Sequence, residues 1–388
     1  MQNNRSVSST SSRNIALAQS QSLSLPLLFT VFGMIMGSWA GRIPAMAERV
    51  HVSHSALSMV LLCGGLGAVL SYPISSRMMG SLGARKTMLV SGMALLAALI
   101  AIGAAPTVPL LMMAVLSLGI TASTFDVAVN SAATKREKQT GKSELSKLHG
   151  LGCAGGLAGA TLGSAMASLH IAPVTHFVML AGPLALALYF GYSQLEADDA
   201  GEIVEKKSFS LPRGPLLFLG AIGFLGSMAE GSIADWSGVF LKEHFGASDG
   251  LAPLALSSFS VMMLLARLVG DRLKVRYGAR SLVTSGSMLG AAGLFFAVLS
   301  PNACFALFGF AVAGMGMALV FPFVFSAAGA QGPVALAGVA SMAYSGSLMG
   351  PPVIGAIAEG LGMQIAIAYI GGLAALIAFV ASRSRLLK

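Results

Sequence analysis

Apolar residues in this chain form long uninterrupted runs, unlike the alternating or one-faced patterns of soluble strands and helices. Runs of about 20 residues without a charge recur from one end of the chain to the other, and such a run is long enough to cross a bilayer as a helix. Pro, Gly and charged residues mark the ends of these runs. The pattern predicts twelve spans, near residues 23–47, 55–79, 86–105, 109–133, 145–168, 173–194, 214–241, 251–273, 280–299, 302–328, 335–358 and 362–382.

Composition agrees with a membrane protein. Of the 388 residues, 55% are hydrophobic and only 10% are charged, whereas a soluble domain carries about 25% charged residues. The 47 glycines also fit, because small residues let helices approach closely in lipid. We therefore predict an all-α membrane protein of twelve transmembrane helices and exclude a soluble enzyme.

The basic residues are distributed unevenly over the predicted loops. If the N-terminus is cytoplasmic, Arg42, Arg49 and Lys242 alone face the outer side, which leaves 21 of the 24 basic residues facing the cytoplasm. Cytoplasmic loops of membrane proteins are enriched in Lys and Arg. The net charge of +9 thus reflects topology and does not indicate a nucleic-acid partner, and we expect both termini in the cytoplasm.

The spans and the stretches between them divide the chain into four parts. We predict a disordered cytoplasmic tail at residues 1–22, a six-helix half at 23–195, a cytoplasmic linker at 196–213 and a second six-helix half at 214–388. The tail is rich in Ser, Asn and Gln and contains no acid, a composition typical of disorder.

The two halves contain an internal repeat. Residues 76–85 align with residues 271–280, and both segments end in Gly-Ala-Arg. Each half has an even number of spans, so the repeats run in the same direction through the membrane. Parallel six-span halves related by an axis along the membrane normal hold substrate between them near the midplane.

The sequence lacks the motifs of several kinds of functional site. Cys63, Cys153 and Cys304 each stand alone in apolar stretches and form neither a disulfide pattern nor a metal-ligand spacing. The sequence has no nucleotide-binding glycine loop and no nucleophile elbow. We expect no cofactor and no enzymatic activity, so any uphill transport would draw on an ion gradient.

Five motifs occur along the chain: residues 37–44 (GSWAGRIP), 126–130 (DVAVN), 148–150 (LHG), 234–237 (ADWS) and 267–273 (RLVGDRL). With these motifs the chain resembles the major facilitator superfamily over nearly its whole length. The resemblance is closest to the bacterial YbjJ/MosC-type branch, which is distantly similar to the fucose:proton symporters. The chain departs from the superfamily pattern at Gly80, where an acidic residue is usual, and from the fucose symporters in having no acid in span one before Glu48.

Polar residues inside the spans indicate the transport site, because an acid at a helix centre costs about 2.5–3.5 kcal/mol. Asp126 and Asn130 are one turn apart in span four, with Ser123 a turn earlier. The resemblance to fucose symporters implies a protonatable carboxyl at Asp126 and a substrate-binding amide at Asn130. The alternative is an acid hydrogen-bonded between helices for structural reasons.

Further site residues follow from the other spans. His149 opens span five and could relay a proton, since histidine titrates near neutral pH; the alternative is a histidine bonded to a helix-end carbonyl. Glu230 lies in a glycine-containing part of span seven and is expected to line the cavity. The proton-coupling candidates are Asp126, Glu230 and His149, and the substrate-binding candidates are Asn130, Ser123, Asp126, Glu230 and Trp39.

Two sets of residues are candidates for gating. Asp235 and Trp236 lie near the outer end of span seven and are expected to form an outer gate or an interfacial anchor, with Arg42 as a candidate partner. The alternative for Arg42 is a side chain that snorkels to the membrane surface. The resemblance implies a cytoplasmic charge motif toward the end of span eight, which acts as a conformational latch and consists of Arg267, Asp271 and Arg272. The alternative is a solvated loop.

These features favour secondary active transport of a small polar solute, such as a sugar, polyol or related metabolite, coupled to protons by alternating access. One alternative is efflux of amphipathic compounds by proton antiport. Another is a membrane sensor that uses a transporter scaffold without transporting. We expect a monomer in the bacterial inner membrane, with the lipid bilayer, protons and a small-molecule substrate as partners.

The charge distribution makes the topology testable. A cysteine introduced at Ser248 should react with a membrane-impermeant thiol reagent added outside intact cells, whereas one at Ser143 should react only after the cells are opened. Labelling of whole cells followed by mass spectrometry measures both. The opposite pattern would overturn the assignment of the spans.

Overall fold

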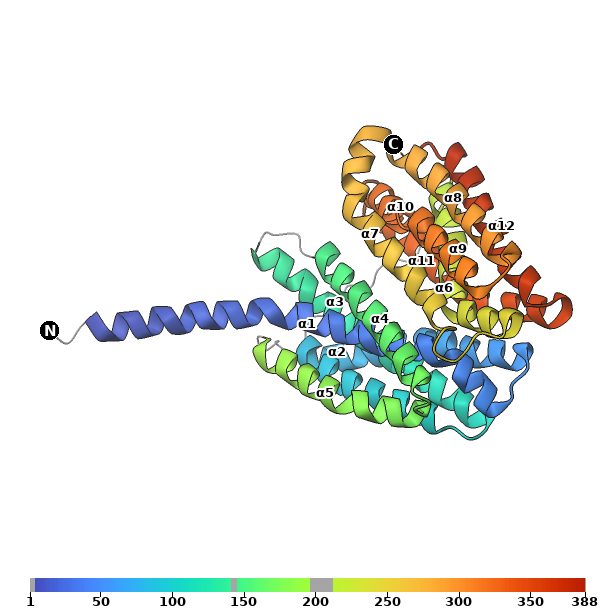
Figure 1. Ribbon diagram of the computed structural model, residues 1–388. Helices are drawn as coiled ribbons and strands as arrows, with labels where there is room; N and C mark the ends of the chain where they lie inside the picture. Colours follow the sequence, from blue (N-terminus) through green and yellow to red (C-terminus); the bar gives the residue numbers. More distant parts are fainter. Residues whose placement is uncertain (1–3, 141–144, 196–211, 388) are drawn as a thin grey trace.

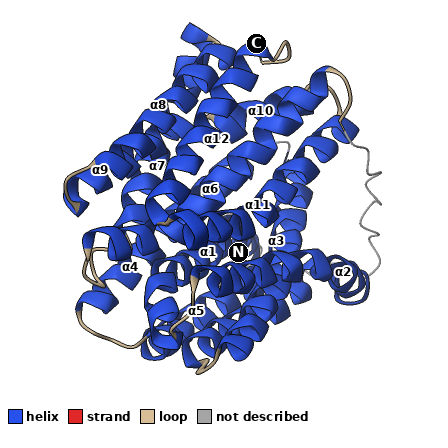
Figure 2. Cartoon of the chain, turned by 90° about the vertical axis from the view of Figure 1, so that its right-hand side faces the viewer, coloured by secondary structure: helices blue, strands red, loops and turns tan. Residues whose placement is uncertain are grey.

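The computed structural model describes residues 4–140, 145–195 and 212–387, and helices are the regular elements within these ranges (Figures 1 and 2). The N-terminal half contains α1 (Asn4–Val50), α2 (His54–Ala104), α3 (Val108–Thr140), α4 (Leu145–Ser168) and α5 (Pro173–Gln194). The C-terminal half contains α6 (Pro215–Phe245), α7 (Leu254–Tyr277), α8 (Ala279–Leu299), α9 (Ala303–Met317), α10 (Val320–Gly329), α11 (Pro333–Leu361) and α12 (Met363–Arg383).

These helices match the predicted spans. Eight segments of the described chain are long and apolar enough to cross a membrane, and one of them, the 51-residue α2, covers spans two and three. The less apolar α4, α7 and α11 cover spans five, eight and eleven, and α9 with α10 forms span ten. The predicted all-α, twelve-span fold is confirmed. Residues 196–211 of the predicted linker lie outside the described ranges.

The N-terminal segment differs from the prediction. α1 begins at Asn4, so residues 4–22 are helical where a disordered tail was expected. Figure 1 shows this part of α1 projecting away from the other helices. The segment contains no Pro or Gly before Pro26, so nothing in the sequence interrupts a helix that extends backward from span one.

The internal repeat is visible in the backbone. Gly83 lies at φ 75°, ψ 169° where α2 turns from span two into span three. Gly278, its repeat partner, lies at φ 74°, ψ 154° between α7 and α8. This conformation is accessible almost only to glycine, so both connections are reduced to a single residue. The two halves therefore make the same turn at the same repeat position.

Span ten is interrupted between α9 and α10. Pro322 has no N–H and cannot donate to the carbonyl four residues earlier, which belongs to Ala318. Ala318 is the C-cap of α9, and α10 begins at Val320. The break leaves the Ala318 carbonyl free to accept a hydrogen bond from a side chain.

Small residues allow close packing of α1 against α4. A Cβ atom added at Gly37 would lie 1.9 Å from the carbonyl oxygen of Gly156, which is far inside van der Waals contact. Lipid offers no hydrophobic drive between helices, so such close approach is what holds membrane helices together. Gly37 thus fixes the distance between the two helices that carry Arg42 and His149.

The two halves meet at one end of the bundle. Contacts between them join α1 to α6, α2 to α11, and α4 to α7. Close contacts at this end include Gly238 against Pro44 and Gly250 against Ser168. We call it the closed end; α1, α4, α6 and α11 all terminate there, opposite both chain termini. Figure 1 shows the halves diverging away from it.

Replacing Gly37 by alanine should destabilise the protein. The added methyl group would force α1 and α4 apart, at a cost of about 1–3 kcal/mol typical of overpacking. The melting temperature of the purified protein in detergent measures this. Gly182→Ala in α5 is the matched control, since its Cβ would meet no atom within 4 Å. Equal melting temperatures for the two variants would contradict the described packing.

Candidate functional site: polar clusters between the halves

A polar chain crosses the N-terminal half from α3 to α4. The Asn130 Nδ2 group donates to the carboxylate Oδ1 of Asp126 at 2.9 Å and to its backbone carbonyl, also at 2.9 Å. The His149 Nε2–H group donates a hydrogen bond to Asn130 Oδ1 at 3.1 Å. The sequence placed Asp126 and Asn130 on one helix face, and the structure adds His149 to the same chain. The Asn130 amide therefore links the His149 ring to the Asp126 carboxylate.

Aromatic side chains surround this polar chain. The Phe29 ring of α1 makes an edge contact with His149, with ring centroids 5.1 Å apart. Tyr344 of α11 and Tyr72 of α2 lie close enough to interact electrostatically with each other, and Tyr344 does so with Asp126. Since Tyr344 belongs to the C-terminal half, Asp126 faces the region between the halves.

Ser123 and Trp39, which were predicted to bind substrate, contact other parts of the N-terminal half. Ser123 accepts a hydrogen bond from Ser71 of α2 at 2.7 Å, and Ser75 donates to Thr124 at 3.1 Å, so these hydroxyls join α2 to α3. Trp39 is buried in the core of the N-terminal half. The structure brings neither residue into the Asp126–Asn130–His149 chain.

The C-terminal half places a charged pair at the same depth. Arg267 of α7 lies 3.9 Å from the Glu230 carboxylate of α6. Its Nε atom donates to the Ala318 carbonyl at 3.0 Å, the group left free by Pro322, and one terminal nitrogen reaches Cys153 Sγ of the other half at 3.4 Å. Arg267 therefore lies inside the bundle and contacts both halves.

The predicted cytoplasmic latch is only partly described. Arg272 is exposed near the end of α7, and the side chain of Asp271 lies outside the described part of the chain. The guanidinium of Arg267, which was grouped with them, makes the interior contacts given above.

Arg42 is buried within the N-terminal half. Its guanidinium donates to the carbonyls of Gly163 at 3.3 Å and Ile171 at 2.5 Å, near the end of α4. No hydrogen bond or ion pair joins Arg42 to Asp235 within the described residues, so the expected partnership in an outer gate is not found. These two backbone carbonyls partner a cation that is buried inside the N-terminal half.

Asp235 and Trp236 lie in α6 toward the closed end. Asp235 is half-buried, and Trp236 is fully buried with its ring centroid 6.2 Å from that of His54. His54 belongs to the N-terminal half, so Trp236 does pack where the halves meet.

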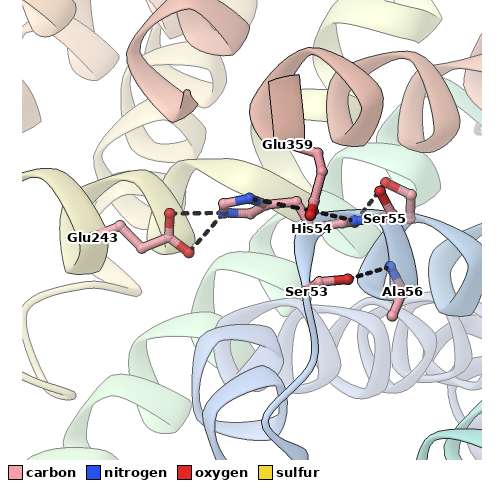
Figure 3. Close-up of polar contacts among 7 residues, drawn as sticks. Ser53, His54, Ser55, Ala56, Glu243 and Glu359 are labelled. Carbon is pink, nitrogen blue, oxygen red and sulfur yellow. Dashed lines mark hydrogen bonds and ion pairs between the residues drawn. The ribbon is translucent and has the colours of Figure 1, made fainter. Parts of the chain in front are cut away.

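A histidine at the start of α2 links three helices at the closed end. Figure 3 shows His54 Nε2 between the two carboxylate oxygens of Glu243 in α6, at 2.9 and 2.8 Å. The Glu359 carboxylate of α11 lies 3.9 Å from His54 Nδ1 and accepts from the Ser55 backbone N–H at 3.1 Å. Both glutamates belong to the C-terminal half, so these contacts hold the halves together.

A second charged cluster lies at the same end. Lys242 of α6 forms ion pairs with Glu48 of α1 and with Asp249, the latter at 2.6 Å. We call these contacts, together with those of His54, the closed-end network. Each exposed pair contributes about 0.2–1 kcal/mol, so closure depends on several weak contacts that can be broken during transport.

The sequence did not predict the closed-end network. All its members lie within a few residues of a predicted span end on the outer side, and this shared position was a usable signal. The pairing itself depends on how the two halves align, which no short-range pattern contains.

Comparison with known proteins settles the family. The sequence model described as Major Facilitator Superfamily matches residues 25–345. The chain belongs to the major facilitator superfamily. It is an integral membrane transporter of that class, and the resemblance found in the sequence is confirmed.

Individual relatives within the superfamily agree. The chain is 33% identical to an uncharacterized transporter, y4wD, of Sinorhizobium fredii over 91% of its length and 95% of the relative's. It is 29% identical to the membrane protein MosC of Rhizobium meliloti, covering 88% of this chain and 84% of MosC. A crystal structure of a mutant of the nucleoside transporter NupG superposes with a TM-score of 0.75 at 15% identity, over 94% of this chain and 100% of NupG, which shows a shared fold.

Weakening the closed-end network should favour conformations in which the two halves are separated at the closed end. We expect the double variant Glu243→Gln, Glu359→Gln to shift the open population by about two- to tenfold, because both carboxylates facing His54 lose their charge. Spin labels at Leu169 and Leu361, exposed positions on opposite halves, report the distance between the halves.

The control for this experiment is Arg49→Gln. Arg49 is at the same end but bonds to the Gly103 carbonyl within one half, so its removal should leave the distance distribution unchanged. An identical distribution for the double variant and the parent would show that His54 does not hold the halves together.

Proposed function

We propose that this protein is a secondary active transporter that moves a small polar solute by proton-coupled alternating access. One observation carries the proposal: two ionisable clusters, Asp126–Asn130–His149 and Glu230–Arg267, lie on opposite halves. Asp126, Glu230 and Arg267 are near the middle of their helices. Buried charges are costly in a membrane and persist there mainly where they serve a pathway.

The contacts between halves support alternating access. They extend from the closed end to the Arg267–Cys153 contact at mid-depth, so solute cannot pass the closed end in this state. With both termini in the cytoplasm, as the charge distribution predicts, this is the inward-facing state. Opening the other way requires the closed-end network to separate while the opposite ends of the halves approach each other.

Proton coupling follows from the position of Asp126. A charged carboxylate is costly to carry through an apolar constriction, and a bound proton removes that charge. The Asn130 amide bonds to Asp126 now, and an incoming solute hydroxyl would compete for the same groups. Binding of the proton and of the solute would thus be linked at adjacent atoms.

The solute class rests on the resemblance to fucose:proton symporters, which favours sugars and polyols. The fold shared with a nucleoside transporter adds nucleosides to the compounds worth testing. A thermal-stability screen of these three classes on purified protein identifies ligands, since a compound that binds the folded state raises the melting temperature. Flux into or out of vesicles under an imposed pH gradient then distinguishes uptake from antiport efflux, and the absence of flux would favour a sensor.

Asp126→Asn should abolish accumulation while leaving exchange. One charge moved down 100 mV supplies about 2.3 kcal/mol, which at about 1.4 kcal/mol per tenfold supports roughly a fortyfold gradient. Asparagine keeps the shape but cannot ionise, so we expect the gradient to fall to about one while counterflow continues. Proteoliposomes loaded with a ligand from the screen measure both.

Asn130→Ala is the companion variant. It removes the amide but leaves the carboxyl, so it should weaken solute binding and retain accumulation at saturating solute. If Asp126→Asn accumulates solute as well as the parent does, the coupling carboxyl lies elsewhere and Glu230 becomes the candidate.

A further inference from the structure

The guanidinium of Arg267 is held in place at one edge. Its Nε atom donates to the Ala318 carbonyl at 3.0 Å, which is available because Pro322 cannot bond to it. This hydrogen bond ties the side chain of α7 to the break between α9 and α10. The guanidinium therefore has a fixed orientation, and its two terminal nitrogens face away from the anchor.

Those two nitrogens have weak partners. One donates to Cys153 Sγ at 3.4 Å, and sulfur is a poor acceptor. The other lies 3.9 Å from the Glu230 carboxylate, which is ion-pair distance but too long for a hydrogen bond. Glu230 Oε2 is buried and has no hydrogen-bond partner among the described residues. Buried hydrogen-bond donors and acceptors without full partners destabilise a protein, and a ligand that bonds to them removes this cost.

The two terminal nitrogens lie where the two halves of the transporter meet. One of them contacts Cys153 in α4 of the N-terminal half, and the other lies beside Glu230 in α6, so the edge that they form lies at the boundary between the halves. Solute is held at this boundary near the midplane in transporters with two parallel halves. The edge formed by two guanidinium nitrogens matches the two oxygens of a carboxylate better than any other side chain does.

We propose that Arg267 binds a carboxylate group of the transported solute, so that the substrate is a small hydroxylated acid such as a sugar acid. This inference rests on the proposed transport function and narrows its substrate class. The solute carboxylate takes the place of Glu230 beside Arg267, and Glu230 takes up one proton from water. The charge of the loaded site then equals that of the empty one, so loading adds no net charge to the membrane interior.

Cys153 provides a probe of this site that needs no knowledge of the substrate. Iodoacetate and iodoacetamide alkylate the same thiolate, with loss of iodide, but only iodoacetate carries a carboxylate. The ratio of their rates at Cys153 therefore reports carboxylate attraction, because the reactivity of the thiol cancels. The measurement uses the purified full-length chain in neutral detergent with Cys63 and Cys304 replaced by serine, and free glutathione gives the reference ratio.

We expect a rate ratio at Cys153 about tenfold above that of glutathione, in line with a hydrogen bond between charged groups. Arg267→Gln should return the ratio to the reference value, and Arg267→Lys should retain part of the increase. Glu230→Gln should raise the ratio further, because the competing carboxylate is gone. A melting temperature for each variant confirms that it is folded, and the Glu230 variant tests the proposal even if both arginine variants unfold.

A wild-type ratio equal to that of glutathione would overturn the proposal, and so would an elevated ratio that survives Arg267→Gln. Matched solutes complete the test: gluconate should protect Cys153 from iodoacetamide at lower concentration than glucitol does. Equal protection, or none by gluconate, refutes the carboxylate site while leaving transport of neutral solutes intact. A raised iodoacetate ratio in a protein that moves no solute would instead refute the proposed transport and keep the anion site.

Discussion

The structure depends on how few charged groups a membrane interior tolerates without a partner. The interior charges in the described part of the chain meet that constraint in different ways. Asp126 is bonded by an amide one turn away, Arg42 by two backbone carbonyls, and Arg267 by a carbonyl that a proline has freed. Glu230 Oε2 is buried without a hydrogen-bond partner among the described residues, and Glu230 lies beside Arg267, which contacts both halves.

Charged residues that bond within one half can be distinguished from those that contact both halves. The first kind suits a structural role and the second a functional one. The Arg42 guanidinium is fully buried and bonded within one half, so it can stabilise that half without responding to movement between the halves. Arg267 contacts both halves, and at least one of its contacts must change when they move relative to each other. The closed-end network has the same property at the membrane surface, where water lowers the cost of breaking it.

Much of the fold could be predicted from the sequence because the membrane imposes a long, one-dimensional pattern. Residues 145–168 and 173–194 were predicted as spans and are helical over the same residues in α4 and α5. Pairing within one helix, as for Asp126 and Asn130, was equally accessible, since it depends only on helical periodicity. The disordered tail was predicted from composition alone, whereas α1 runs through residues 4–22, which contain no Pro or Gly.

Contacts between distant segments were not predictable in the same way. His54 and Glu243 are separated by 189 positions, and their pairing depends on the alignment of the two halves. Arg267 was assigned to a loop motif by resemblance, although Pro322, far along the chain, determines where its side chain lies. The sequence contained each residue of the site but not the geometry that combines them.

The one-residue turns at Gly83 and Gly278 have a mechanical consequence. Spans two and three are joined by a single non-helical residue, and so are their repeat counterparts, spans eight and nine. Neither connection has a loop that could lengthen or shorten. Neither helix of such a pair can shift along its axis without moving the other. A displacement at one membrane face is therefore passed on to the opposite face. The interruption at Ala318–Leu319 lies inside span ten and not between two spans, so it gives that span a point of bending that neither glycine turn supplies.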